Sequence, residues 1–246
     1  MGGLSSSPVS IVLVHGGFVD GAGWEGVYNV LKNDGYNVSI VQNPTTSLAD
    51  DVAATRLAIA RTQGPVVLVG HSYGGAVITV AGTEENVKAL VYLSGYALTE
   101  GESLAELQGR FPDSLLASGL VYRTYPVQGS ADPGTDVSVD PAKFREIFAA
   151  DVDEDLARVL AVSQRPLAAA AFTEKAAAAA WRTKPAWGTL SVADHTINPD
   201  VERFGYSRAG ITPVEIDSHL VMLSHPKEAF AVIRQAVDSL QDTTRG

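Results

Sequence analysis

Short apolar runs of strand length alternate with helix-spaced segments over the first part of the chain, and this alternation limits the possible folds most. The strand-like runs, rich in Val, Ile and Leu, lie at 11–14, 36–41, 65–69 and 87–93. The spacing of apolar residues predicts helices between these runs, at 24–33, 47–62 and 74–83. Because strand–helix–strand units join parallel strands by right-handed crossovers, the pattern predicts an α/β fold with a mostly parallel sheet flanked by helices.

The composition agrees with one large unit whose sheet is covered on both faces. Of the 246 residues, 46% are hydrophobic and 19% are charged, which is enough apolar material for a two-sided core. The absence of cysteine excludes disulfides, thiolate–metal sites and a cysteine nucleophile. A net charge of −10 without any Lys/Arg-rich stretch argues against nucleic acids and anionic membranes as partners.

The first residues, Met1 to Pro8, lack the basic region and the apolar core of a signal peptide, and we interpret them as a flexible arm. No apolar run of the sequence is long enough to span a bilayer. We therefore expect a soluble cytoplasmic protein. Its assembly stays open between a monomer and a homodimer.

The alternation stops in the middle of the chain and resumes near its end. Between 99 and 184 we find helical patches and loops but no buried strand, and the alanine-rich stretch Ala168–Trp181 favours a helix. Strand patterns then return at 187–192 and 212–216. Pro226 stands in the first turn of a last amphipathic helix. The sequence thus predicts a helical cap at 99–184, inserted into an α/β core of 1–98 and 185–246.

The motif Gly-His-Ser-Tyr-Gly at 70–74 follows directly on the predicted strand at 65–69. A turn of this type between a strand and a helix lifts the serine hydroxyl clear of the backbone, and its glycines leave room for the tight bend. The N–H groups of the helix that follows point to where negative charge develops during attack on a carbonyl. These features predict Ser72 as a nucleophile.

A second glycine-rich segment, His-Gly-Gly-Phe at 15–18, ends the first predicted strand. Open α/β sheets bind their ligands at this edge, so a backbone N–H of the loop can reach the same oxyanion as the Tyr73 N–H. We assign this donor to Gly17, with Phe18 as the alternative. Such a donor stabilises a transition state by about 3 kcal/mol. We interpret His15 as a brace for the loop.

A serine nucleophile needs a general base, and the candidates are His15, His71, His195, His219 and His225. In hydrolases of this type the order along the chain is serine, acid, histidine. His219 follows the last predicted strand and precedes the final helix, so it reaches the same sheet edge as the serine and is the predicted base. We interpret His71 as packing beside the turn and His225 as a helix cap, while His195 could line the pocket.

The acid that orients this histidine is expected after the preceding strand. Asp194 stands there, where its carboxylate would hold the His219 ring in the correct tautomer. Asp200 and Glu202 follow where a helix begins, so a first-turn surface role suits them better. Asp217 is too near His219 along the backbone to be the preferred partner.

With these residues in this order, the chain resembles the α/β-hydrolase superfamily, and most closely the small branch of plant methylesterases, hydroxynitrile lyases and bacterial esterases. The resemblance rests on Val-Leu-Val-His-Gly-Gly at 12–17, Gly-His-Ser-Tyr-Gly-Gly at 70–75, Ala193-Asp194 and Ser218-His219. It implies a helical cap at 99–184. It also implies that neither a cofactor nor a metal is needed.

Three positions separate the chain from other members of this branch. The lyases related to plant esterases have a lysine directly after the catalytic histidine, where this chain has Leu220, and a second lyase type has asparagine in place of Gly16. Haloalkane dehalogenases have aspartate in place of Ser72. The resemblance thus implies a serine esterase that cleaves a small, largely apolar carboxylic ester or lactone. A lyase or cofactor-free oxygenase with the same triad, and a ligand-binding receptor with little turnover, remain alternatives.

Aromatic residues are the candidates for the walls of a substrate pocket. Phe18 and Tyr73 adjoin the predicted reacting centre in sequence. The aromatic candidates of the predicted cap are Tyr122, Tyr125, Phe144, Phe148 and Trp181. Each cap aromatic also fits ordinary core packing. The expected partner is a small-molecule ester.

Overall fold

The computed structural model describes residues 8–242, and its centre is a 6-stranded sheet in which each pair of neighbouring strands is parallel. The strands follow the order β2-β1-β3-β4-β8-β9. Their bounds are β1 Ser10–Val14, β2 Asn37–Val41, β3 Val66–His71, β4 Val87–Leu93, β8 Ala186–Leu190 and β9 Val214–Glu215. Each strand overlaps a run predicted as strand, so the predicted α/β fold is confirmed.

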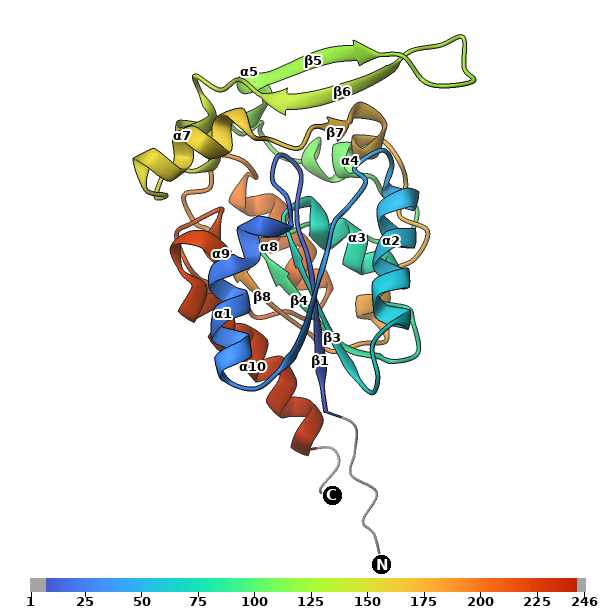
Figure 1. Cartoon of the computed structure of the whole chain (residues 1–246), viewed down its shortest axis with the longest axis vertical. Helices are drawn as coiled ribbons and strands as arrows, with labels where there is room; N and C mark the ends of the chain where they lie inside the picture. Colours follow the sequence, from blue (N-terminus) through green and yellow to red (C-terminus); the bar gives the residue numbers. More distant parts are fainter. Residues whose placement is uncertain (1–7, 243–246) are drawn as a thin grey trace, which may run out of the picture.

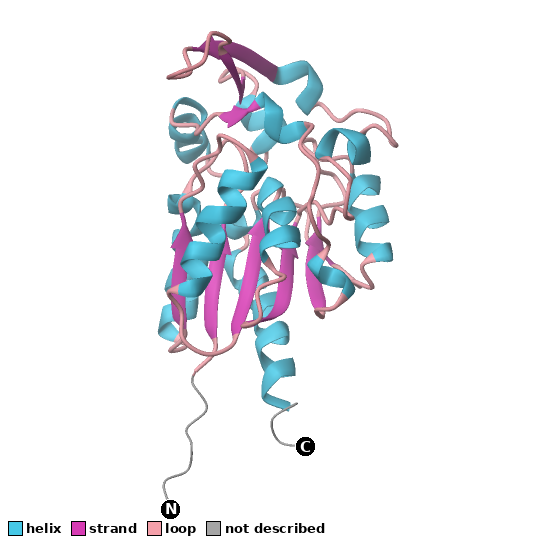
Figure 2. Cartoon of the chain, turned by 90° about the vertical axis from the view of Figure 1, so that its right-hand side faces the viewer, coloured by secondary structure: helices cyan, strands magenta, loops and turns pink. Residues whose placement is uncertain are grey.

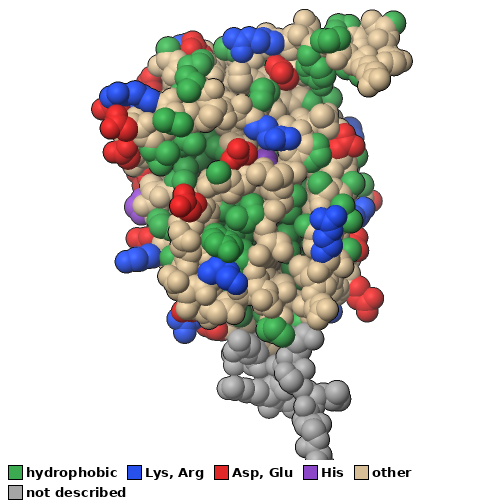
Figure 3. Space-filling view, viewed as in Figure 1, with side chains coloured by type: hydrophobic (Ala, Val, Ile, Leu, Met, Phe, Trp, Pro, Cys, Tyr) green, Lys and Arg blue, Asp and Glu red, His purple; other side chains and the backbone are tan. Residues whose placement is uncertain are grey.

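Helices cover both faces of this sheet (Figures 1 and 2). Their bounds are η1 Gly21–Trp24 (a 3-10 helix), α1 Glu25–Asn33, α2 Leu48–Ala60, α3 Tyr73–Ala81, α8 Pro199–Arg208, α9 Val221–Ser224 and α10 Pro226–Asp242. The helices α1 and α10 pack together on one face, and α2 packs with α3 on the other. On the side shown in Figure 3, acidic and basic side chains are interspersed, so neither sign forms a continuous field there.

Continuous apolar runs account for the middle of the sheet. Every residue of β1 and β3 is buried, as parallel strands covered on both faces require. The edge strand β9 is short and exposed. Within residues 8–242, no helix is long and apolar enough to cross a membrane. The rigid part of the molecule therefore lies around β1, β3 and β4, whose carboxyl ends carry the candidate site.

Most of residues 99–184, for which we keep the name cap, lies over the carboxyl ends of these strands, whereas its last residues run down beside α3 (Figure 1). The elements of the cap are α4 Leu104–Gln108, α5 Leu116–Gly119, β5 Leu120–Tyr125, β6 Gly134–Val139, α6 Phe144–Phe148, α7 Glu154–Val162, β7 Leu167–Ala168, and the 3-10 helices η2 Ala169–Phe172 and η3 Ala180–Arg182. That the chain divides into core and cap at these boundaries stays a prediction.

The prediction that this segment contains no strand is wrong. The strands β5, β6 and β7 form a 3-stranded antiparallel sheet. Residues of β5 are exposed or half-buried, and in β6 only Val137 and Val139 are buried. Strands with one solvated face alternate polar and apolar residues, so they lack the continuous apolar run that marks the parallel strands.

The predicted helix over Ala168–Trp181 is also wrong, because the segment contains only the end of β7 and short 3-10 turns. Its backbone groups bond to other parts of the chain: the Ala168 N–H donates to the Thr45 carbonyl at 2.8 Å, and the Ala176 N–H to the Glu102 carbonyl at 2.9 Å. Alanine's helix propensity is a weak preference that such tertiary hydrogen bonds override.

Candidate active site

Ser72 lies in the sharp turn between β3 and α3, as predicted from the motif. Its backbone has φ 53° and ψ −121°, a left-handed conformation that costs a residue with a side chain about 1–3 kcal/mol. Three backbone hydrogen bonds hold it there. The Ser72 N–H donates to the Leu93 carbonyl at 3.2 Å, and the Ser72 carbonyl accepts from the N–H groups of Gly75 at 2.9 Å and Tyr96 at 3.2 Å. The end of β4 therefore fixes the direction of the serine.

Glycine is required on both sides of this turn. A Cβ at Gly70 would lie 2.4 Å from the Gly74 carbonyl oxygen, and one at Gly74 would lie 2.5 Å from the Val14 carbonyl oxygen. In both cases the obstacle is backbone, which cannot rotate away as a side chain can. The close approach of β1, β3 and α3 thus depends on these two residues.

His219 and Asp194 form a buried hydrogen-bonded pair. The His219 Nδ1 lies 2.7 Å from Asp194 Oδ2, while Asp194 Oδ1 accepts from the backbone N–H groups of Thr196 at 2.7 Å and Ile197 at 3.0 Å. A carboxylate can only accept, so Nδ1 carries the proton and Nε2 is left as an acceptor. Within residues 8–242, Nε2 has no hydrogen-bond partner, although it is buried.

His71, directly before Ser72, positions the loop of His219. Its Nε2–H donates to the His219 carbonyl at 2.8 Å, and the two rings meet edge to face with their centroids 5.0 Å apart. Burial, and then the neighbouring His219 ring, hold the pKa of His71 well below its ordinary value, so the ring is neutral. Packing beside the turn was predicted for His71, whereas its bond to His219 has no signal in the sequence.

His15 braces the loop that follows β1, as predicted. Its Nδ1–H donates to the Gly16 carbonyl at 2.8 Å, and its Nε2 accepts from the Asn43 N–H at 2.9 Å. The Asn43 side chain returns a bond to the His15 carbonyl at 2.9 Å. Burial lowers the pKa of His15, which keeps Nε2 available as an acceptor.

The same loop lies against Ser72, and its Gly17 N–H has no acceptor among residues 8–242. A Cβ at Gly16 would lie 2.9 Å from the Ser72 Cβ, so the two backbones are in close contact. The Phe18 N–H is occupied, because it donates to the Arg165 carbonyl at 3.2 Å. This favours Gly17 over Phe18 as the first oxyanion donor. Tyr73 is the first residue of α3, so its N–H has no acceptor within the helix.

Apolar side chains from the cap cover this group. Phe148 of α6 contacts the His219 ring with centroids 4.9 Å apart and the Phe18 ring at 5.7 Å. Leu167 of β7 lies over the loop, since a Cβ at Gly17 would meet its Cδ2 at 3.1 Å. Phe18 and Phe148 are almost fully buried. The surroundings of Ser72 and His219 are therefore apolar and shielded from solvent.

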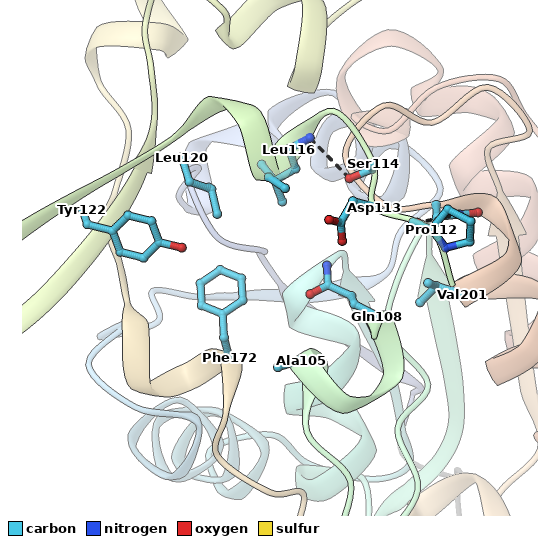
Figure 4. Close-up of a pocket in the computed structure, with 12 residues that line it drawn as sticks. Ala105, Gln108, Pro112, Asp113, Ser114, Leu116, Leu120, Tyr122, Phe172 and Val201 are labelled. Atoms are coloured by element: carbon cyan, nitrogen blue, oxygen red, sulfur yellow. Dashed lines mark hydrogen bonds between the residues drawn. The ribbon is translucent and has the colours of Figure 1, made fainter. Parts of the chain in front are cut away.

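The side chains of three predicted pocket aromatics have hydrogen-bond partners elsewhere or are exposed. The Tyr73 phenol is buried and donates to Asp51 Oδ2 at 2.7 Å, and the Trp181 Nε1–H donates to the Leu98 carbonyl at 2.7 Å. Tyr122 is 62% exposed on β5. Its ring contributes to a cap cavity of about 230 Å³, where it faces Phe172 and Leu120 (Figure 4).

A second cavity of about 270 Å³ lies beside the acid–base pair. It is lined by Ile147, Phe148, Ala150, Asp151, Ser191, Ala193, Asp194, His195, Asp217, Ser218 and His219. His195 is exposed there and bonds through Nδ1 to the Glu146 carbonyl at 2.8 Å. Asp217 accepts from the Ala193 N–H at 3.0 Å and has no hydrogen bond to His219. His225 lies at the surface, where its Nε2 is 3.5 Å from Asp151.

The expected surface role of Glu202 is wrong. Its side chain is buried in α8, with 1% of its surface exposed, whereas Asp200 of the same turn is exposed and paired with Arg203 at 2.9 Å. Glu202 shares a helix face with Gly205 and Tyr206, three and four positions on, and both are buried. This spacing is the signal that could have indicated a buried carboxyl group.

Known proteins resemble this chain in sequence pattern and in fold. A model described as "Alpha/beta hydrolase family" matches residues 11–233. The structure is similar to polyneuridine aldehyde esterase, with TM-score 0.78 and 19% identity over 93% of this chain and 99% of that chain. It is also similar to a methylesterase from Arabidopsis (TM-score 0.75, 16% identity, 94% and 99% covered).

A third similar structure is a pyrethroid hydrolase from Sphingobium faniae JZ-2, with TM-score 0.75 and 18% identity over 95% of this chain and 99% of that chain. At identities this low, the likeness shows a common fold. No curated protein matches the sequence.

Proposed function

We propose that this chain, which belongs to the alpha/beta hydrolase family as its motifs predict, is a serine esterase for small, largely apolar carboxylic esters or lactones. The observation that carries the proposal is the His219–Asp194 pair. The Nδ1 of His219 is held by the buried Asp194 carboxylate. The buried Nε2 of His219, beside the turn of Ser72, lacks a hydrogen-bond partner among the described residues. A general base needs this combination of a fixed tautomer and a free acceptor nitrogen.

In the first half of the proposed reaction, the Ser72 Oγ attacks the ester carbonyl while His219 Nε2 takes its proton. Asp194 stabilises the imidazolium that forms. The N–H groups of Gly17 and Tyr73 donate to the oxyanion of the tetrahedral intermediate. His219 then gives the proton to the leaving alcohol, and an acyl-enzyme remains on Ser72.

In the second half, water attacks the acyl-enzyme and His219 again acts as base. The acid leaves, and the Ser72 hydroxyl is restored. Every group in this sequence belongs to the chain or the substrate, so the proposed reaction uses neither a cofactor nor a metal.

The side chains around the reacting centre support an apolar substrate. Phe18, Phe148 and Leu167 surround the serine and the base, and all three are buried hydrophobic residues. A strongly anionic substrate would need a basic side chain at this position. We therefore propose a pocket that includes Phe18 and Phe148 but not the side chains of Tyr73, Tyr122 and Trp181.

The names of the similar structures, an esterase, a methylesterase and a hydrolase, favour ester hydrolysis. The residue after the base supports the same choice over cyanohydrin cleavage. Leu220 is fully buried and apolar, so it offers no charge to a cyanide leaving group. We further propose that the chain divides into a core and a cap at 99–184 and that the cap selects the substrate. We also propose a cytoplasmic location.

The test is a burst assay with p-nitrophenyl esters of increasing acyl length. We expect the wild type to release about one equivalent of nitrophenol rapidly before steady turnover, as acyl-enzyme formation requires. Ser72→Ala should lower kcat by about four to six orders of magnitude. The matched control is Ser10→Ala, a buried serine at the amino end of β1, which should keep wild-type turnover. Equal hydrolysis by wild type and Ser72→Ala on every ester would refute the proposal.

A further inference from the structure

Glu202 is a buried carboxyl group that the proposed mechanism does not use. It lies in the first turn of α8 with 1% of its surface exposed. If it is ionised, neither of its oxygens has a hydrogen-bond partner among the residues described. A buried charge without partners is strongly unfavourable, so the group needs either a cation or a proton.

Among the described residues, no basic side chain is paired with Glu202. Arg203 is the basic group that acts on Glu202, but it is half-exposed and its guanidinium is paired with Asp200 at 2.9 Å. The other titratable groups facing Glu202 are Asp194 after β8, Tyr96 after β4, and Tyr206 on α8 itself. The Ser191 backbone N–H weakly favours the charged form.

Burial, then the charge of Asp194 and a hydrogen bond shared with it, raise the pKa of Glu202 well above its ordinary value. A hydrogen bond between two carboxyl groups requires a proton on one of them. Asp194 accepts three hydrogen bonds, from His219, Thr196 and Ile197. Glu202 has only the Ser191 N–H acting in its favour, so we place the proton on Glu202.

We propose that Glu202 is a positioning residue whose protonated carboxyl donates a hydrogen bond to Asp194 and thereby fixes the acid that orients His219. The role of Glu202 in catalysis rests on the proposed esterase function, whereas the protonation state of Glu202 does not. The donated bond anchors the Asp194 carboxylate from the side of α8. It also limits the charge of the buried carboxyl pair to one.

This arrangement has a measurable linkage to pH. The pKa of Glu202 is raised in the folded state, so the stability that its proton contributes is complete below the unfolded value of about 4.3. It is lost as the pH rises from that value through the folded pKa, because the unfolded chain ionises first. Glu202→Gln has no proton to lose there. The equilibrium constant for folding of Glu202→Gln, divided by that of the wild type, should therefore rise by up to about tenfold per pH unit over this interval.

The experiment compares Glu202→Gln, Glu202→Leu and the control Asp200→Asn in urea unfolding from pH 4.5 to 8.5. Asp200 lies in the same turn but is exposed, so Asp200→Asn should follow the wild-type curve. In an Asp194→Asn background, the pH interval over which Glu202→Gln gains stability relative to its parent should become narrower, because the charge of Asp194 is gone. A gain for Glu202→Gln that is constant with pH, or one unaffected by Asp194→Asn, overturns the proposal.

The kinetic arm uses the p-nitrophenyl ester at each pH. Glu202→Leu keeps the volume but loses the donor, so kcat should fall by about ten- to a hundredfold with KM little changed, as the loss of a hydrogen bond to a charged group predicts. Glu202→Gln retains an N–H donor and should recover most of this loss. A kcat for Glu202→Leu equal to wild type overturns the positioning role.

Failure of the proposed function gives a different result. If wild type shows no Ser72-dependent hydrolysis, the esterase proposal fails, and the positioning role fails with it. The pH dependence of unfolding still decides whether Glu202 holds a proton against Asp194. The two proposals therefore fail on different measurements.

Discussion

The parallel sheet and the cap hold their residues by different means. In β1 and β3 every residue is buried, and the turn at Ser72 is enclosed by backbone. In β5 no residue is buried, and side-chain hydrogen bonds help to join the cap to the core, such as those from Thr45 Oγ1 to the Pro166 carbonyl at 2.8 Å and from the Ser114 Oγ to the Thr196 carbonyl at 2.7 Å.

The two regions therefore contribute different parts of the candidate site. The sheet brings together the serine, the acid and the base from the ends of β3, β8 and β9. The cap supplies Phe148, whose ring contacts the His219 ring, and Leu167, which lies against Gly17 of the loop after β1. Changes in the sheet should therefore alter kcat and stability, and changes in the cap should have smaller effects.

The largest effect is expected for Asp194→Asn. An amide at this position donates where the carboxylate accepts, so His219 takes the wrong tautomer and kcat should fall by about 10⁴. The measurement is steady-state hydrolysis of a p-nitrophenyl ester. Asp217→Asn is the control, because Asp217 borders the same cavity but bonds to the Ala193 N–H. Equal losses in the two variants would contradict the role of Asp194.

A second contrast concerns two glycines near the serine. Gly74→Ala places a Cβ 2.5 Å from the Val14 carbonyl, and the fixed backbone should make this overpacking cost about 1–3 kcal/mol or prevent folding. Gly17→Ala meets a flexible cap side chain, Leu167, at 3.1 Å and should cost less. Urea unfolding of both variants measures the difference. The comparison of sheet and cap breaks down if Gly17→Ala is the more destabilised variant.

The sequence predicts best the part of the molecule where closely packed backbone leaves no room for side chains. A continuous apolar run leading into glycines at 70 and 74 leaves few alternatives to a strand, a tight turn and a helix. The antiparallel strands of the cap escaped prediction because half-exposed strands carry mixed residues. The helix expected at Ala168–Trp181 does not form because N–H groups of this segment donate to the carbonyls of Thr45 and Glu102, and no local pattern predicts these hydrogen bonds.

The candidate site shows the same division. The positions of Ser72, Asp194 and His219 after strands could be predicted from the sequence, and so could the pairing of His219 with Asp194. Contacts between distant segments could not be predicted. Examples are the hydrogen bonds from His71 to the His219 carbonyl and from the Phe18 N–H to the Arg165 carbonyl. A charged residue such as Glu202 is normally exposed, so its burial overrides the most reliable rule of sequence interpretation.

A third prediction concerns acid stability. The pKa of His71 is lowered in the folded state, so its contribution to stability is complete above the unfolded value and is lost as the pH falls below about 6.5. The loss is up to about 1.4 kcal/mol per pH unit. His71→Gln can still donate to the His219 carbonyl and should show a flatter profile in urea unfolding from pH 7.5 to 5. A slope equal to wild type would show that His71 is protonated in the fold.

The smallest effect is expected where the cap attaches to the sheet. Glu174 accepts from the N–H groups of Leu48 at 2.5 Å and Ala49 at 3.1 Å, and so caps the start of α2. Glu174→Gln loses the charge at the helix N-terminus, which should lower the free energy of unfolding by about 0.5–1 kcal/mol and leave kcat unchanged. Glu154→Gln, in an exposed pair on α7, is the control and should cost less. A loss from Glu174→Gln as large as that from Gly74→Ala would mean that the cap is held as firmly as the sheet, and the contrast between the two regions would then be false.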